Sequence, residues 1–426
     1  MEKIGDSMYS LCRRLFPICR SITGDGVRET LRIMREVMPD IKVHEVPSGT
    51  KTFDWEIPKE WNIRDAWIKN SKGEKIVDFR ESNLHVMGYS KPIHKEMTTE
   101  ELKTHLYTQP DQPDAIPYVT SYYKDSCGFC VTQRQYDNLP EDIYTVHIDS
   151  DLRCGSLTYG DIVIPGESDD EIFVSAYICH PSMANDNISS LSVALYLAKW
   201  INGLEKRRYT YRFVFAPETI GAIAYLSLHL DRMKKHTVAG FTLSCTGDDR
   251  TFSYIASRDG NTLADRVLKN ILHFYHPQYK AYEYLERGSD ERQYDAPGID
   301  LPVCGICRSK YWEFPEYHTS FDNMDFISPD GLYGTYRLLQ KCVESLENNF
   351  KYKVQCHGEP QLGKRGLYPL VSRKGQYDEL TSMMNFIAYS DGKHDLIDIS
   401  DIIRAPVWEL LPIIDKLVKA KLIKRG

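Results

Sequence analysis

Residues 172–190 read IFVSAYICHPSMANDNISS and contain, in order, an apolar run, a polar loop and the start of a helical pattern. The apolar run 172–178 has the length and composition of a buried strand. Beyond the loop, apolar residues recur at helical spacing, namely Leu191, Ala194, Leu195, Ala198 and Ile201. This order of strand, loop and helix predicts an α/β fold in which the loop lies at the carboxyl end of a buried strand.

Two polar side chains of this loop, His180 and Asp186, have the chemistry of metal ligands. In open α/β sheets, ligands and metals bind at the carboxyl ends of the strands. An imidazole and a carboxylate on one tight loop can face the same divalent ion. The loop alone leaves a second interpretation open, in which His180 ends the strand and Asp186 or Asn187 caps the following helix.

Ionisable residues also stand at the ends of other strand patterns. They are Glu218 after the run 211–215, Asp248 after 239–245, Asp290 and Glu291 before 301–306, and His318 beyond that run. Strands that alternate with helices at this spacing predict a mixed, mostly parallel sheet with helices on both faces. Two histidines with several carboxylates and without cysteine are typical of a catalytic zinc, or of a pair of metal ions, with an open position for water.

Length and composition are those of a globular protein with two or three domains. The 426 residues are 42% hydrophobic, and the formal net charge of -7 argues against a protein that coats nucleic acid. The apolar runs are much shorter than the ~20 residues of a membrane span. A polar first segment and an odd number of cysteines, eleven, favour the reducing cytoplasm. The CxxC pairs at 127–130 and 304–307 are too far apart for a zinc ribbon.

Changes in hydrophobic pattern divide the chain into regions. Two helical patterns occupy residues 3–38, and short β-branched and aromatic runs follow from about residue 43. A stretch rich in glycine, proline and basic residues precedes three final helical patterns. We predict an α/β domain from residues 1–42 and 144–350, an inserted mainly-β domain at 43–143, a linker at 351–375, and a small winged-helix-like domain at 376–426.

The order of the polar motifs resembles that of the zinc aminopeptidase family that includes the bacterial leucyl aminopeptidases and glutamate carboxypeptidase. The matching segments are His180, Asp186-Asn187-Ile188-Ser189-Ser190, Glu218-Thr219-Ile220-Gly221, Ser289-Asp290-Glu291 and Tyr317-His318-Thr319-Ser320-Phe321-Asp322. The resemblance implies that one or two zinc ions are held by His180, Asp186 and His318, and that Glu218 is the general base. It also implies that Asp248, Asp290 and Glu291 are further candidate ligands or substrate contacts.

One branch of that clan is more similar still, because it shares the motifs Tyr122-Tyr123 and Gly128-Phe129-Cys130. Members of the branch carry an inserted β domain and a winged-helix-like domain at the carboxyl end. Three positions depart from the wider family: Ser182 replaces an aspartate that orients the first histidine, Thr219 replaces a metal-binding glutamate, and Glu291 replaces a histidine. The loss of such carboxylates predicts a single metal ion or a weakened affinity.

The carboxyl-terminal region is basic, with 13 lysines and arginines against 9 aspartates and glutamates from residue 351 onward. Such a balance permits contact with nucleic acid. However, Glu409 and Asp415 lie on the last helical pattern among its lysines, which favours packing or dimerisation over DNA binding.

The leading hypothesis is a cytoplasmic, metal-dependent hydrolase of amide bonds, of the aminopeptidase or deacylase type, that acts on a peptide or another small amide. We expect no membrane attachment, and self-association through the carboxyl-terminal or inserted domain remains open. The competing hypothesis is a degenerate aminopeptidase fold that binds a small molecule and signals through its winged helix. Ser182, Thr219 and Glu291 favour that alternative, whereas Glu218 and the two histidines favour the enzyme.

Overall fold

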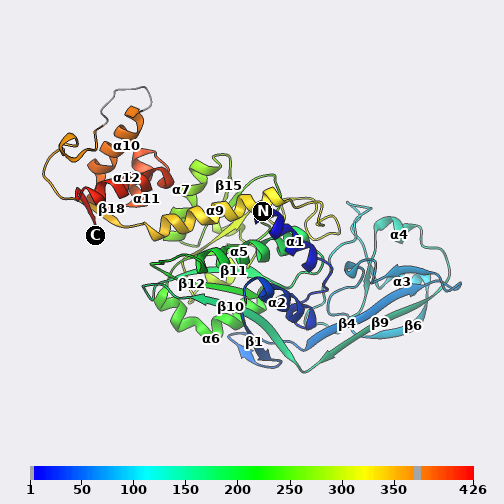
Figure 1. Cartoon of the computed structure of the whole chain (residues 1–426). Coiled ribbons are helices and arrows are strands. Elements are labelled where there is room, and N and C mark those ends of the chain that lie inside the picture. Colours follow the sequence, from blue (N-terminus) through cyan, green and yellow to red (C-terminus); the bar gives the residue numbers. More distant parts are fainter. Residues whose placement is uncertain (1–3, 369–375) are drawn as a thin grey trace. The chain divides into compact units, whose positions relative to one another are not determined.

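The structure is a computed structural model that describes residues 4–368 and 376–426 (Figure 1). The chain forms two compact units. The first, called the α/β unit below, comprises residues 1–260 and 280–336, and the second, called the carboxyl-terminal unit, comprises residues 261–279 and 337–426. Helix α9 (Pro329–Glu347) begins in the first unit and ends in the second.

An eight-stranded mixed sheet forms the centre of the α/β unit, as the alternation of strands and helices predicted. The four central strands, β12, β11, β13 and β16, run parallel to one another, and β10 and β14 pair antiparallel with them. In spatial order the strands are β1 (Lys42–Pro47), β10 (Ser156–Ile164), β12 (Thr210–Ala216), β11 (Glu171–Tyr177), β13 (Thr237–Leu243), β16 (Val303–Cys307), β14 (Ser253–Ile255) and β15 (Lys280–Tyr282).

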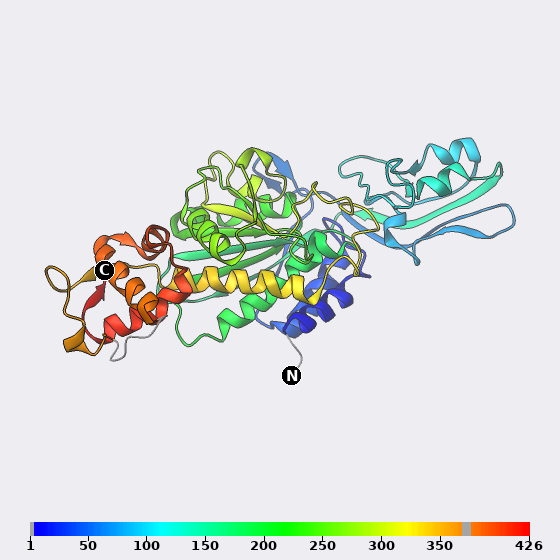
Figure 2. The same cartoon turned by 90° about the horizontal axis from the view of Figure 1, so that it is seen from above.

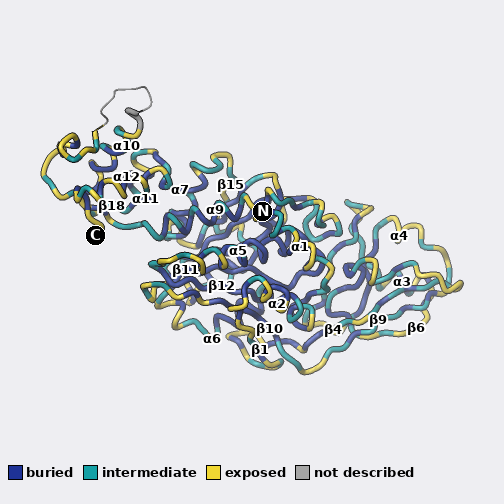
Figure 3. Tube along the Cα trace, viewed as in Figure 1, coloured by how far each residue is buried: buried dark blue, intermediate teal, exposed yellow. Residues whose placement is uncertain are grey.

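Helices cover both faces of this sheet, which confirms the predicted fold class. Helices α1 (Ile4–Leu15), α2 (Asp25–Val37) and α5 (Ser190–Asn202) pack together on one face, and α6 (Ile220–His236) packs on the other (Figures 1 and 2). Every residue of β11 and β12 is consequently buried, and Figure 3 shows the sheet and α5 as the most buried part of the unit. Central parallel strands covered on both faces require the continuous apolar runs that the sequence has there.

The inserted module contains an antiparallel sheet in the order β5-β4-β9-β6 with a hydrophobic core of its own. Its elements are β2 (Lys51–Thr52), β3 (Trp55–Glu56), β4 (Glu60–Lys69), β5 (Lys75–Asp78), η1 (Asn83–His85), β6 (Ile93–Thr98), α3 (Thr99–Lys103), β7 (Leu106–Tyr107), β8 (Phe129–Cys130), α4 (Gln133–Asp137) and β9 (Ile143–Arg153). The predicted boundaries 43 and 143 need correction. Strand β1 pairs with β10 and so belongs to the large sheet, and β9 pairs with β4 as far as Arg153 and so continues the inserted sheet.

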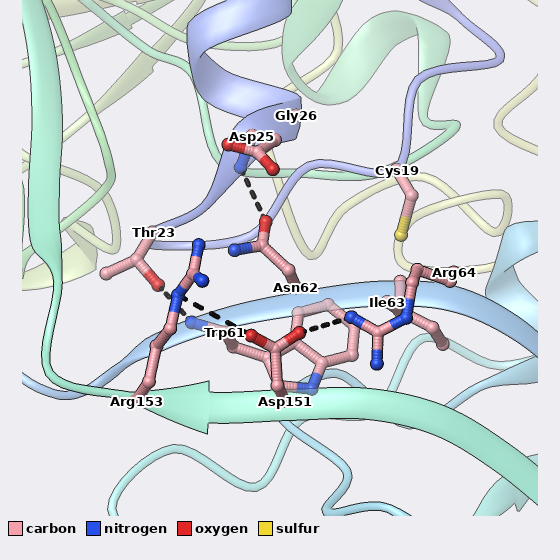
Figure 4. A pocket seen from close by; sticks show the side chains of 10 residues that line it. All are labelled: Cys19, Thr23, Asp25, Gly26, Trp61, Asn62, Ile63, Arg64, Asp151 and Arg153. Atoms are coloured by element: carbon pink, nitrogen blue, oxygen red, sulfur yellow. Dashed lines mark hydrogen bonds and ion pairs between the residues drawn. The ribbon is translucent and has the colours of Figure 1, made fainter.

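A small cavity of about 220 Å³ lies where the inserted sheet meets helix α2 (Figure 4). The Asn62 side chain accepts a hydrogen bond from the backbone N–H of Asp25, at the start of α2. Arg64 and Arg153 both point toward Asp151, with nearest nitrogen–oxygen distances of 2.6 and 3.5 Å. The charges around this cavity therefore compensate one another, and the contacts connect the inserted sheet to the α/β core.

The carboxyl-terminal unit contains a winged-helix domain, as predicted, but the domain begins earlier in the chain. Strand β17 pairs with β18 and β19 in a three-stranded sheet, and Cys356, Leu362 and Leu367 pack against its core. Much of the predicted linker 351–375 thus belongs to the domain, and its residues 369–375 lie outside the described residues. The elements are α7 (Leu263–Tyr275), β17 (Lys351–Val354), η4 (Gly363–Arg365), α10 (Gln376–Tyr389), β18 (Asp391–Asp395), α11 (Leu396–Ile403), α12 (Val407–Lys419) and β19 (Ile423–Arg425). Across the described residues of both units, we find no helix with the length and apolarity needed to cross a bilayer.

Candidate active site

Four of the predicted site residues meet at one edge of the large sheet. His180 follows β11, Asp186 lies in the irregular helical turn η2 (Ala184–Ser189), Glu218 follows β12, and His318 lies in the loop that precedes α9. The Oδ2 atom of Asp186 is 3.1 Å from Nε2 of His318 and 4.0 Å from Nε2 of His180. The Oε2 atom of Glu218 is 3.9 Å from the same His180 nitrogen. The fold thus brings together two imidazoles that lie 138 positions apart in the chain.

The surroundings of His180 and Asp186 favour the metal-binding form of each group. Burial lowers the pKa of His180 to about 4, so at neutral pH the imidazole is uncharged and keeps a lone pair. Burial opposes ionisation of Asp186, but His180, His318 and the hydroxyl of Tyr177, which donates to this carboxylate, lower its pKa to about 2. Neutral imidazole and ionised carboxylate are the ligand forms that zinc requires.

The Nε2 atom of His318 shows that the cluster fits a cation. This buried nitrogen has no hydrogen-bond partner among the described residues, although the Asp186 carboxylate lies close to it. Unpaired buried polar atoms are rare in folded proteins because they lose their hydration without compensation. A divalent ion between His180, Asp186 and His318 would satisfy this nitrogen, and the ligand atoms of the three residues all lie within 4.8 Å of one another.

Glu218 borders the cluster and remains partly accessible, with 23% of its side chain exposed. Burial and the charges of Asp290 and Asp186 raise the pKa of Glu218 well above its ordinary value. Burial also raises the pKa of Asp290 to about 7, although its carboxylate accepts a hydrogen bond from the backbone N–H of Thr219. Asp290 therefore contacts the backbone of the turn that carries Glu218, and its charge raises the pKa of Glu218.

Several residues that hold the cluster were not predicted from the sequence. The carboxylate of Asp322 accepts the backbone N–H groups of Asn185 and Asp186 at 2.7 and 2.9 Å, which fixes the turn that presents Asp186. The buried guanidinium of Arg20 donates to the carbonyl oxygen of His180 at 2.9 Å. Asp322 was visible in the Tyr317–Asp322 motif, whereas Arg20, 160 positions from His180, gave no signal.

Cys179 is the most informative of these unpredicted residues. Its sulfur lies 3.3 Å from Nδ1 of His180 and accepts the backbone N–H of Glu218, also at 3.3 Å. The predicted departure at Ser182 is real, because the Ser182 hydroxyl donates to the carbonyl oxygen of Phe16 instead of contacting His180. The Cys179 sulfur thus lies at hydrogen-bond distance from Nδ1 of His180, and Nε2 of the same ring faces Asp186.

Two of the candidate ligands, Asp248 and Glu291, do not join the cluster. The Asp248 carboxylate accepts hydrogen bonds from Asn185, Ser309 and the backbone of Arg250. The Glu291 carboxylate accepts the backbone N–H groups of Gly288 and Ser289 and the hydroxyl of Tyr311. Both carboxylates are engaged in local hydrogen bonds and lie outside the group formed by His180, Asp186 and His318. Neither CxxC pair contributes to a group of potential metal ligands in the described part of the chain.

A pocket of about 370 Å³ opens onto the cluster, with His180, Glu218 and His318 in its wall. The inserted module supplies much of the remaining wall. The backbone N–H of Tyr118 donates to the carbonyl oxygen of His318, and the Tyr118 ring lies 5.3 Å from the His180 ring and 5.1 Å from the His318 ring. The inserted module is therefore part of the site.

Comparisons with known proteins agree with this architecture. Residues 9–349 match a family described as "Domain of unknown function (DUF4910)", and residues 350–425 match a winged helix-turn-helix family. A protein from Clostridium acetobutylicum, named "Putative polysaccharide biosynthesis protein with aminopeptidase-like domain", is 46% identical over 402 residues, which cover 94% of this chain and 92% of the relative.

Solved structures give the same result for the fold. The "putative peptidase" from Clostridium acetobutylicum superposes with a TM-score of 0.93 at 44% identity, over 99% of this chain and 96% of that one. A zinc aminopeptidase from Bacillus subtilis superposes with a TM-score of 0.60 at 12% identity, over 81% of this chain and 96% of that one. The second likeness is a likeness of fold, and it confirms the predicted resemblance to the zinc aminopeptidases.

Proposed function

The chain belongs to the DUF4910 family, and from the geometry of its site we propose that it is a zinc-dependent hydrolase of amide bonds. The observation that carries the proposal is the convergence of His180, Asp186 and His318 on one point, with Glu218 beside them. Two imidazoles and one carboxylate with an open position are the ligand set of catalytic zinc sites. The peptidase-like fold of the relatives supports the same class of reaction.

In this proposal His180, Asp186 and His318 hold the ion, and Glu218 transfers the proton. When bound, zinc lowers the pKa of a water molecule to about 7 and polarises the amide carbonyl. Glu218 accepts a proton from the attacking water and delivers it to the leaving nitrogen, a role that contributes ~10²–10⁴ to the rate in comparable enzymes. We propose one ion per chain, because Thr219 lacks a carboxylate and Asp248 is engaged elsewhere.

Metal removal tests the proposal directly. The purified protein is expected to contain about one zinc per chain, and dialysis against a chelator is expected to abolish the hydrolysis of amide substrates. One equivalent of zinc should then restore the activity, which release of amine from aminoacyl anilides and N-acetylated compounds would measure. A protein that hydrolyses amides equally well without metal, or that carries zinc and hydrolyses none of them, contradicts the proposal.

Cys179 supplies a second test, because we propose that its contact with Nδ1 orients the His180 ring. Replacement of Cys179 by alanine removes the sulfur that contacts Nδ1 of His180 and is expected to weaken zinc affinity by ~10–100-fold, as is usual for partners of metal-binding histidines. Cys179→Ser retains an acceptor and should recover part of the affinity. Competition with a chromogenic chelator measures both constants, and unchanged affinity in Cys179→Ala contradicts the assigned task.

Substrate and location are further parts of the proposal. The name of the Clostridium acetobutylicum relative refers to polysaccharide biosynthesis, and amino sugars often carry an N-acyl amide, so both peptide and sugar amides are candidate substrates. We propose a cytoplasmic location, which the free state of the eleven cysteines supports. We further propose that the winged helix serves packing or self-association, since Glu409 and Asp415 are exposed on α12.

A further inference from the structure

The pocket of about 370 Å³ that contains Glu218 has an aromatic wall contributed by the inserted module. Trp55, Tyr118, Tyr122 and Tyr123 line it. Trp55 lies on strand β3, and its ring packs against the ring of Tyr123 with a centroid distance of 6.2 Å in an edge-on arrangement. Both rings remain open to solvent, with 43% of Trp55 and 55% of Tyr123 exposed. Exposed aromatic faces beside a small pocket offer flat apolar platforms with polar edges, and such platforms favour ligands that have an apolar face and a hydroxylated rim.

The charge of the pocket restricts its ligands further. Among the described residues that line it, there is neither a lysine nor an arginine. Arg292 is close to the wall, where it donates hydrogen bonds to the carbonyl oxygen of Ser289 and the hydroxyl of Thr219. A carboxylate or phosphate in the pocket would lose its hydration and would find neither a lysine nor an arginine to pair with in the part of the lining that the structure describes. N-acyl amino acids and nucleotide-linked sugars are therefore poor ligands for this pocket.

A free ammonium group beside the scissile amide is disfavoured as well. Within the described lining, Glu218 is the single carboxylate, and the proposed reaction uses it as a base. Thr219 is neutral, and the buried Asp290 carboxylate accepts the backbone N–H of Thr219 behind the wall. The amino terminus of a peptide would thus find no separate anion to pair with its charge.

We propose that the site removes the acyl group from a neutral N-acyl amino sugar, an inference that rests on the proposed amide hydrolase. One face of the sugar ring packs on Trp55 with Tyr123 at its edge, and the acyl amide lies against Glu218 and the two histidines. The water oxygen forms a bond to the acyl carbon while the carbon–nitrogen bond breaks. Glu218 passes one water proton to the nitrogen, and the other reaches it from the acid product, so that a carboxylate and a protonated amino sugar leave. The cavity of about 370 Å³ has room for one sugar residue.

Three matched amides test this assignment with the zinc-loaded protein. They are methyl N-acetyl-β-glucosaminide, which is neutral, N-acetylalanine, which adds a carboxylate, and alanine p-nitroanilide, which adds an ammonium group. We expect kcat/KM for the sugar to exceed that for either other compound by at least tenfold, from the release of acetate or nitroaniline. A preference for the anilide or for N-acetylalanine overturns the substrate class but leaves the hydrolase in place, whereas hydrolysis of none of the three overturns the proposed hydrolase.

Binding provides a readout that does not depend on turnover. The neutral sugar should bind to Glu218→Gln in calorimetry, and Trp55→Ala in that background should weaken binding by about tenfold, with partial recovery in Trp55→Phe. The matched control is Trp67→Ala, on strand β4 outside the pocket, which should bind the sugar as before. Equal binding by Trp55→Ala and Trp67→Ala, or no binding of the sugar at all to a folded protein, overturns the proposed sugar site.

Discussion

Glu218→Gln is expected to lower kcat for amide hydrolysis by ~10²–10⁴ and to leave the zinc content at about one ion per chain. Glutamine has nearly the same shape as glutamate, so the pocket and its neighbours keep their positions. It cannot accept the proton of the attacking water, however, nor return it to the leaving nitrogen. The structure places Glu218 Oε2 3.9 Å from the His180 nitrogen that faces Asp186, at the border of the proposed zinc site.

The zinc content of the Glu218→Gln variant distinguishes between two roles of Glu218, a general base and a zinc ligand. Cys179, His180 and Glu218 also form a group with the spacing of metal ligands, so a Glu218 that binds the ion would lose zinc as well as activity on substitution. The control is Glu291→Gln, because the Glu291 carboxylate accepts hydrogen bonds from Gly288, Ser289 and Tyr311. Elemental analysis and initial rates are the measurements. Full activity in Glu218→Gln removes the assigned base.

Local patterns predicted the fold of the α/β unit because its strands bury both faces. The apolar runs that became β11 and β12 are continuous and short, as a central strand covered on both faces requires, and every residue of both strands is buried. Boundaries were less predictable where pairing decides them. Strand β9 includes Asp149, Asp151 and Arg153, which a pattern assigns to a loop, because pairing with β4 extends the inserted sheet.

In the candidate site, too, residues placed by local sequence were predictable, and residues placed by contacts between distant segments were not. His180, Asp186, Glu218 and His318 were predictable because each follows a strand or a recognisable motif, and parallel strands end at one edge of the sheet. Arg20 was not predictable, because it meets the site through a contact between distant segments. For Asp248 and Glu291, a strand end predicts a position near the edge of the sheet but does not decide where the carboxylate points.

Asp186→Asn is expected to reduce bound zinc from about one ion per chain to nearly none. The Asp186 carboxylate lies between the two imidazoles, 3.1 Å from His318 and 4.0 Å from His180, and is the single charged member of the proposed ligand set. Asparagine keeps the shape and can still accept the hydroxyl of Tyr177, so the turn should remain folded. The neutral amide loses the attraction to a divalent ion, and this attraction is strong in a site that excludes water.

Asp248→Asn is the matched control because Asp248 is equally buried and lies outside the cluster. Its carboxylate accepts hydrogen bonds from Ser309 and Asn185, so the variant can be less stable, yet its folded fraction should keep about one zinc ion. Thermal unfolding monitored by circular dichroism identifies the folded fraction of each variant, and elemental analysis after gel filtration gives the metal. Zinc retained in Asp186→Asn but lost in Asp248→Asn would transfer the site to Asp248, as the family pattern allowed. Zinc retained in both would mean that the two histidines do not depend on either carboxylate, and the proposed centre would then be wrong.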